Sequence, residues 1–228
     1  MRVTLIMPPT VDPLTAADVK ARLGYGAEVS DTLASALVAA ARQQLDGYGG
    51  WLGRALNTQT WQMTLPGFYD GKRDRYWFDN RNSLTTNDSK LRIPVPPLQS
   101  ITSITYVDSN GATQTLASNA YRIIRGSTFA TIVPIYGTNW PATQVQEDAV
   151  TITFIAGYGS QPTDVPEPIR TAITLQVSHL KALTAQNIFI SLDRVEGVGE
   201  QRFIVGKGST DVISAAVLSL TENYRVSR

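Results

Sequence analysis

The sequence predicts an α+β protein whose helices, at both ends of the chain, pack as a small bundle around an inserted antiparallel β module. Two observations support this fold class. Apolar residues recur at helical spacing near both ends, over residues 30–52 and 209–224. Between them, residues 56–155 are rich in threonine, valine, isoleucine and aromatic residues, with turn residues separating short runs. Because neither helical stripe can be buried alone, we expect the two ends to pack together.

Residues 1–55 are expected to form an arm followed by two helices. The start, MRVTLIMPP, should be extended, and either frayed or docked on a neighbour. The first helix runs over 14–23, with Thr15 as N-cap and Asp18 three residues later completing a capping box. The second helix runs over 30–52, and glycines near its end should distort its last turn.

Residues 56–160 should form the β module. Alternation and turn residues predict strands over 61–65, 91–95, 101–107, 121–124, 129–133 and 150–155. In the last of these, Val150, Ile152 and Phe154 alternate with mostly hydroxyl-bearing residues, so one face should be buried. Residues 67–90 are polar and turn-rich, and we expect them to leave the core as a long excursion.

Residues 161–228 should form the C-terminal helices and a linker, with 156–228 packing on 1–55. One helix starts near Pro166, with Asp164 as its cap, and has an apolar stripe at Ile169, Ile173, Val177 and Leu180. The linker 184–208 has a predicted hairpin arm over 202–205. Ser209 or Thr210 should cap a final helix, whose apolar side carries Ile213, Ala216, Val217, Leu220 and Tyr224.

Composition excludes several functional classes. The 228-residue chain has no cysteine, which excludes disulfides and thiolate metal sites. Its net charge of +1 gives no overall attraction to nucleic acid or to an acidic membrane. No apolar run approaches the roughly 20 residues that span a bilayer. We therefore expect a soluble protein made in the cytoplasm, with no membrane partner.

No catalytic, metal or cofactor site is predicted, and no cofactor is expected. The single histidine, His179, lies on a helix without a nucleophile motif elsewhere, so it should be a core or interface residue. The Gly157-Tyr158-Gly159 sequence lacks the rest of a dinucleotide fingerprint and should be a structural turn. The aspartates of the excursion do not have the spacing of a calcium loop.

Arginines and aromatic residues alternate around Trp77 in the excursion. Such a pattern suits stacking on single-stranded nucleic acid or contact with a protein. The balanced charge nearby favours protein contact. Sugar binding by Trp77 or Trp140 stays an open alternative.

An ordered series of short motifs resembles the head–tail connector (adaptor) proteins of long-tailed double-stranded DNA phages. The series covers most of the chain and comprises Pro13-Leu14-Thr15, Ala40-Ala41-Arg42, Gly53-Arg54-Ala55-Leu56, Thr60-Trp61, Pro94-Val95-Pro96-Pro97-Leu98, Ile101, Ile104, Tyr106, Asp108, Gly111, Tyr121, Trp140-Pro141, Ala156-Gly157-Tyr158-Gly159, Val165-Pro166-Glu167-Pro168-Ile169, His179-Leu180 and Tyr224-Arg225. The chain departs from the family pattern over 67–90 and after Leu183.

This resemblance implies a structural protein and no enzyme. It implies a ring, a dodecamer in relatives, located in the virion beneath the portal protein. Such a ring extends the channel for double-stranded DNA and joins the next neck or tail component, a stopper or tail terminator. We expect the partner contacts to be made by Arg75, Trp77, Val212, Ile213, Val217, Leu220, Tyr224 and Arg225. The alternative is a non-viral β-sandwich binding module, for example for carbohydrate.

Overall fold

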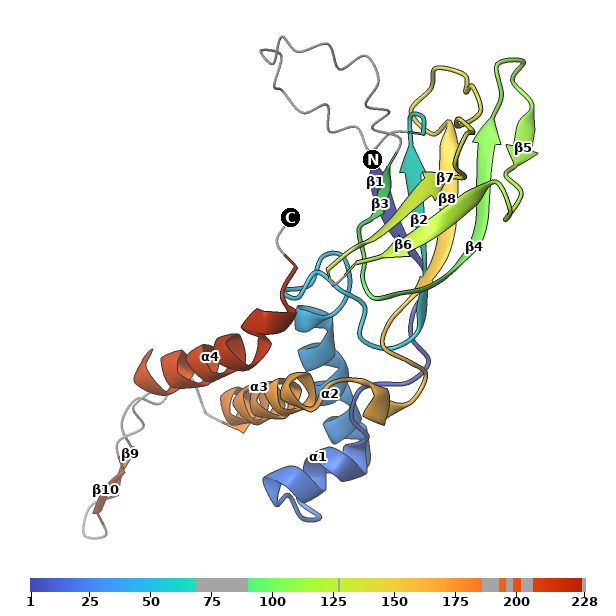
Figure 1. The fold of residues 1–228 in the computed structure, drawn as a ribbon. Helices are drawn as coiled ribbons and strands as arrows, with labels where there is room; N and C mark the ends of the chain where they lie inside the picture. Colours follow the sequence, from blue (N-terminus) through green and yellow to red (C-terminus); the bar gives the residue numbers. More distant parts are fainter. Residues whose placement is uncertain (69–89, 127, 186–192, 196–198, 202–206, 227–228) are drawn as a thin grey trace.

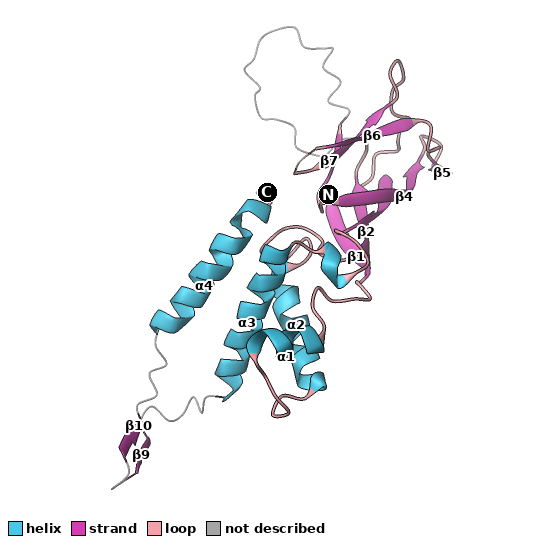
Figure 2. Cartoon of the chain, turned by 60° about the horizontal axis from the view of Figure 1, so that its bottom comes forward, coloured by secondary structure: helices cyan, strands magenta, loops and turns pink. Residues whose placement is uncertain are grey.

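Figure 1 shows the protein as a computed structural model, which describes residues 1–68, 90–126, 128–185, 193–195, 199–201 and 207–226. Side-chain surroundings are described outside residues 184–213. The α+β prediction is confirmed, since the helices gather at one end and strands β1 to β8 at the other, with β9 and β10 beyond the helices (Figure 2). The helices are α1 (Ala16–Leu23), α2 (Asp31–Leu45), α3 (Glu167–Ala185) and α4 (Lys207–Thr221), with short 3₁₀ turns η1 (Pro162–Asp164) and η2 (Glu222–Tyr224).

The strands form a sandwich and a separate small hairpin. A five-stranded antiparallel sheet has the order β1-β2-β8-β4-β5, and a three-stranded one the order β3-β7-β6. Buried residues of both sheets belong to one apolar core, so the sheets pack face to face. The bounds are β1 (Arg2–Met7), β2 (Gln59–Leu65), β3 (Leu91–Ile93), β4 (Leu98–Val107), β5 (Thr113–Thr115), β6 (Tyr121–Arg125), β7 (Ala130–Pro134), β8 (Val150–Ala156), and β9 (Asp193–Val195) paired with β10 (Gly199–Gln201).

Strand β8 shows the predicted alternation. Val150, Ile152 and Phe154 are fully buried, whereas Thr151 and Thr153 are half-buried on the opposite face. Because β8 pairs with β2 on one side and β4 on the other, it is the central strand of the larger sheet.

The first residues of the chain are not a frayed arm. Arg2–Met7 form β1, which pairs antiparallel with β2 of the same chain, from Arg2 opposite Thr64 to Met7 opposite Thr60. The apolar run MRVTLIM was long enough to form an edge strand, and β2 supplies the backbone partners. The sheet therefore includes a strand that precedes the first two helices in the sequence.

The helix starts near the N-terminus follow the prediction. The Thr15 hydroxyl accepts from the Asp18 backbone N–H at 3.1 Å, and the Asp18 carboxylate accepts from the Thr15 N–H at 3.0 Å. The predicted end of the second helix at residue 52 was wrong, since α2 stops at Leu45. Gly47 has φ +80°, and the N–H groups of Trp51 and Leu52 donate to the last helical carbonyls. These bonds cap α2 and fold the following loop back onto it.

Helix α3 begins just after Pro166, as predicted, but Asp164 is not its cap. The Asp164 carboxylate instead accepts from the Gln161 N–H at 2.8 Å and closes the turn η1. The predicted α3 stripe is confirmed, since Ile169, Ile173 and Val177 are fully buried. Each such side chain contributes about 1.5–3 kcal/mol gross.

The final helix begins earlier than predicted. Helix α4 starts at Lys207, so neither Ser209 nor Thr210 is its N-cap. The strands of the predicted linker hairpin are β9 and β10, and the proposed arm 202–205 lies outside the described residues. Within the described part of the chain, no helix is long and apolar enough to cross a membrane.

Candidate assembly interface

The structure places the eight predicted partner residues in three groups. Arg75 and Trp77 lie outside the described residues. Val212 and Ile213 belong to α4, but their side chains are outside the described part. The other four, Val217, Leu220, Tyr224 and Arg225, lie along α4 and the segment after it.

The described apolar stripe of α4 packs within the chain. Val217 is 7% exposed, and Leu220 and Tyr224 pack half-buried against the same core, which holds residues of α1, α2 and α3. The helical bundle of the same chain thus packs against Val217, Leu220 and Tyr224, which we expected a partner protein to cover. Contact of these residues with another protein stays a prediction. Among the described side chains of α4, the exposed large apolar one is Leu218, at 43%.

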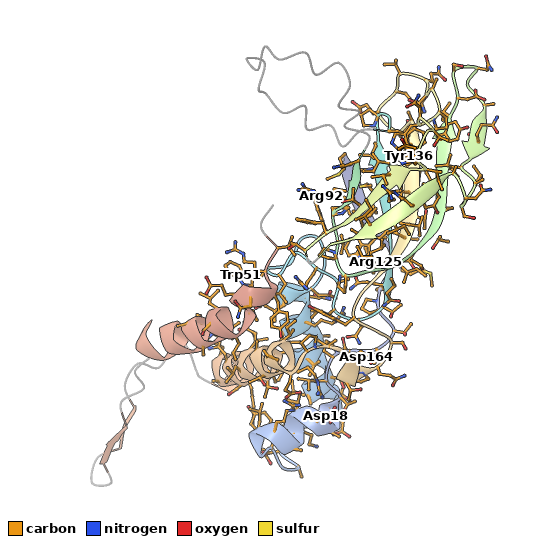
Figure 3. All side chains as sticks on the ribbon, viewed as in Figure 1. Asp18, Trp51, Arg92, Arg125, Tyr136 and Asp164 are labelled. Atoms are coloured by element: carbon orange, nitrogen blue, oxygen red, sulfur yellow. The ribbon has the colours of Figure 1, made fainter. Side chains whose placement is uncertain are left out.

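The segment after α4 is fixed to the loop that follows α2. The Arg225 guanidinium lies over the Trp51 ring, 3.9 Å from its centroid, beside the end of α4 (Figure 3). The Val226 backbone N–H donates to the Leu52 carbonyl at 2.9 Å, and the Val226 side chain is 4% exposed. Arg225 therefore holds the C-terminal segment on this chain, while Trp51 keeps 39% of its surface accessible.

A buried carboxylate joins the helical bundle to the β sandwich. Asp46, the residue after α2, accepts from the Leu56 N–H and the Gln59 amide, each at 2.9 Å. Its other oxygen pairs with Arg42 at 3.0 Å, and Arg42 also pairs with Asp12 at 2.6 Å. Burial raises the pKa of Asp46, although the Leu56 N–H, Gln59 and Arg42 oppose this. These contacts make Asp46 a structural link between α2 and β2.

The Gly157-Tyr158-Gly159 sequence serves the same junction. The N–H of Gly157 donates to Pro97 and that of Tyr158 to Leu56, and the Tyr158 hydroxyl accepts from Arg54 at 2.6 Å. A Cβ on Gly157 would lie 2.3 Å from the Asn57 carbonyl oxygen. These contacts agree with the predicted structural turn.

Trp140 is half-buried at the β core. Its ring stacks on Phe68, with centroids 4.8 Å apart and planes 6° from parallel, and it packs against the β core. His179 lies half-buried on α3. Among the described residues, no group of three His, Cys, Asp or Glu side chains could hold a metal ion.

Several large apolar side chains of the β sandwich are exposed, and the sequence reasoning did not single them out. Strand β1 leaves Leu5, Ile6 and Met7 exposed at 40, 48 and 60%. On the loops beyond β7, Tyr136 is 98% exposed (Figure 3) and Val145 is fully exposed. The sequence signal for β1 was the apolar run itself, in which apolar and polar residues do not alternate regularly. Single apolar residues in loops carry no sequence signal.

No protein-family model matches the sequence, and a search of curated proteins gives no match. Solved structures do share the fold. A chain of the structure described as "Neck of empty GTA particle computed with C6 symmetry" has a TM-score of 0.65 at 17% identity. The match covers 100% of this chain and 97% of that one.

Two further structures of the same kind match over the same extent. A chain of "Virion of native gene transfer agent (GTA) particle" has a TM-score of 0.65 at 18% identity. A chain of "Neck of native GTA particle computed with C12 symmetry" has a TM-score of 0.57 at 15% identity. Each covers 100% of this chain and 97% of the matched chain, so the shared fold includes both the bundle and the sandwich.

Proposed function

We propose that this chain is a structural head–tail connector (adaptor) of a tailed-phage-like particle. The observation that carries the proposal is the end-to-end likeness of its fold to chains in the neck and virion structures of a gene transfer agent. A fold alone does not fix a function. Here the sequence series described above points independently to the same class of protein.

In this role the chain forms a ring in the neck of the virion, below the portal protein, and is made in the host cytoplasm. The neck structures were computed with six-fold and twelve-fold symmetry, which supports a cyclic assembly, and we propose a dodecamer. The next neck or tail component binds its other end. A cyclic ring uses two different surface patches on each subunit, which the bundle and the sandwich together can supply.

The ring would extend the channel through which double-stranded DNA passes. The chain has 20 basic and 19 acidic side chains, giving a net charge of +1. A strongly basic lumen would bind phosphates and slow the passage of DNA, so a nearly neutral protein suits this task. We propose no enzymatic activity and no sequence-specific DNA recognition.

The test is an electron-microscopy experiment with the full-length chain and the portal protein encoded in the same genome. We expect images of the mixture to show an added ring of density on one end of the portal. Portal alone is the control. Unchanged portal images, with this chain remaining separate in the mixture, would contradict the proposal.

A further inference from the structure

The β sandwich has an unusual free edge at β1. This strand pairs with β2 on one side, and its other side has no partner among the described residues. Its exposed residues Leu5, Ile6 and Met7 are apolar and extend on both faces of the strand. Exposed apolar edge strands pair readily with other strands, and proteins that stay monomeric usually protect them with charges or prolines.

A second free edge lies on the opposite side of the sandwich. Strand β6 is the last strand of the smaller sheet and leaves Ile124 44% exposed. Strand β6 lies on the β4–β5 side of the sandwich. Arg125 of β6 donates a hydrogen bond to the Gln99 carbonyl of β4 at 3.1 Å, and residues 116–120 connect β5 directly to β6. Strands β2 and β8 separate β4 from β1, so the two apolar edges face away from each other.

The charges beside these edges differ, since the beginning of β1 has both acidic and basic groups and β6 is basic. The exposed carboxylates of Glu147 and Asp148 line a depression with Met1 and Arg2, at the beginning of β1. Strand β6 carries two exposed arginines, Arg122 and Arg125, the second labelled in Figure 3. Contact of β1 with β6 of another copy can bring the carboxylates of Glu147 and Asp148 near the guanidinium groups of Arg122 and Arg125.

We propose that the β1 edge of one copy docks on the β6 edge of the next copy. This inference rests on the proposed ring, because a cyclic assembly needs two unlike patches that face in different directions on each subunit. The two edges meet this requirement, and their lengths match, with six residues in β1 and five in β6. Apolar side chains of Leu5, Ile6 and Ile124 become buried between neighbouring subunits, and the backbone of β1 gains a second strand partner.

The chain contains no cysteine, so engineered cysteines can report this contact without background. The test variant carries Ile6→Cys with Ile124→Cys and is treated, under assembling conditions, with a short flexible bis-maleimide. We expect a ladder of covalent species larger than a dimer, since each subunit then joins two neighbours. The matched control combines Ile6→Cys with Gln114→Cys on β5, the polar free edge of the larger sheet, and should give no ladder.

A lysine variant tests the contact without a crosslinker. Ile6→Lys should prevent assembly, while Gln114→Lys should assemble like the parent chain, and unchanged thermal melting verifies that both are folded. Rings in electron micrographs of the cysteine variant without a ladder would overturn this interface and leave the proposed function standing. Dimers from Ile6→Cys alone, or a ladder only from the β5 pair, would also overturn it. A parent chain that never assembles, alone or with the portal, would contradict both proposals.

Discussion

The Asp46 carboxylate accepts a hydrogen bond from the Leu56 backbone N–H at 2.9 Å, across the loop that separates α2 from β2. The same oxygen accepts from Gln59, the first residue of β2, so one side chain fixes the strand relative to the helix. Since the side chain is 6% exposed, its bonds replace water that the group has lost. This contact is one of those that join the bundle to the sandwich.

Replacing Asp46 by alanine should therefore destabilise the fold strongly. The Leu56 N–H and the Gln59 amide would lose their acceptor, and Arg42 would keep Asp12 but lose Asp46. Breaking a buried charged pair costs about 3–5 kcal/mol. Asp31→Ala is the matched control, because Asp31 pairs with Lys20 on the surface and an exposed pair contributes about 0–1 kcal/mol. Chemical denaturation measures the free energy of unfolding of both variants. Equal losses of stability in the two variants would contradict the role of Asp46.

The stability difference between the parent chain and Asp46→Asn should depend on pH. Burial raises the pKa of Asp46 above its ordinary value of 3.8, so the folded state binds this proton more tightly than the unfolded state. The stabilisation linked to this proton is complete below 3.8 and is lost as pH rises through the raised pKa. Asparagine does not titrate, so the free energy of unfolding of the variant should rise relative to that of the parent as pH increases from about 3 to 7. Denaturation at several pH values measures this, and a constant difference would refute it.

Gly157→Ala should destabilise the junction between β8 and α3. Gly157 has φ +128°, and a Cβ there would lie 2.3 Å from the Asn57 carbonyl oxygen. Strain of this kind costs about 1–3 kcal/mol before the backbone shifts. Gly49→Ala is the control, since nothing lies within 4 Å of its Cβ position and it lacks a positive φ. Thermal melting should show a clear loss of stability for Gly157→Ala and a change in stability within about 0.5 kcal/mol for Gly49→Ala.

Leu218→Lys should weaken assembly while preserving the fold. Leu218 is the large apolar group that α4 leaves 43% exposed, and its neighbours Ser214, Ala215 and Ser219 are uncharged and exposed. A lysine on this face adds a charge that must be desolvated in any interface, but it costs little in the free chain. Ala17→Lys on the exposed side of α1 is the control. Ring formation of Leu218→Lys at the parent level would remove α4 from the interface.

Local signals in the sequence predicted much of the fold. The capping box at Thr15 and the alternation in β8 succeeded because each depends on residues close in sequence. The prediction of where α2 ends was wrong because this end depends on hydrogen bonds from the N–H groups of Trp51 and Leu52, which lie beyond the helix and fold back onto it. The pairing of β1 with β2 was not predicted, for a similar reason: the partner strand lies far along the chain.

The interface was less predictable than the fold. The stripe on α4 was correctly placed on one side of the helix, yet Val217 and Leu220 are covered by the bundle of the same chain. A hydrophobic stripe shows that a helix face will be buried but does not identify what buries it. The exposure of Ile6 and Ile124 depends on which strands end each sheet, and sheet order is not encoded by any single strand.

Pairing of β1 with β2 also affects how the protein is made. The ribosome releases Arg2–Met7 about fifty residues before β2, so the nascent chain carries an apolar segment whose partner does not yet exist. Helices α1 and α2 can form in this interval, because their contacts are local. The amino-terminal strand is thus recruited late, and a nascent chain that stalls before Leu65 would be a substrate for chaperones or proteases.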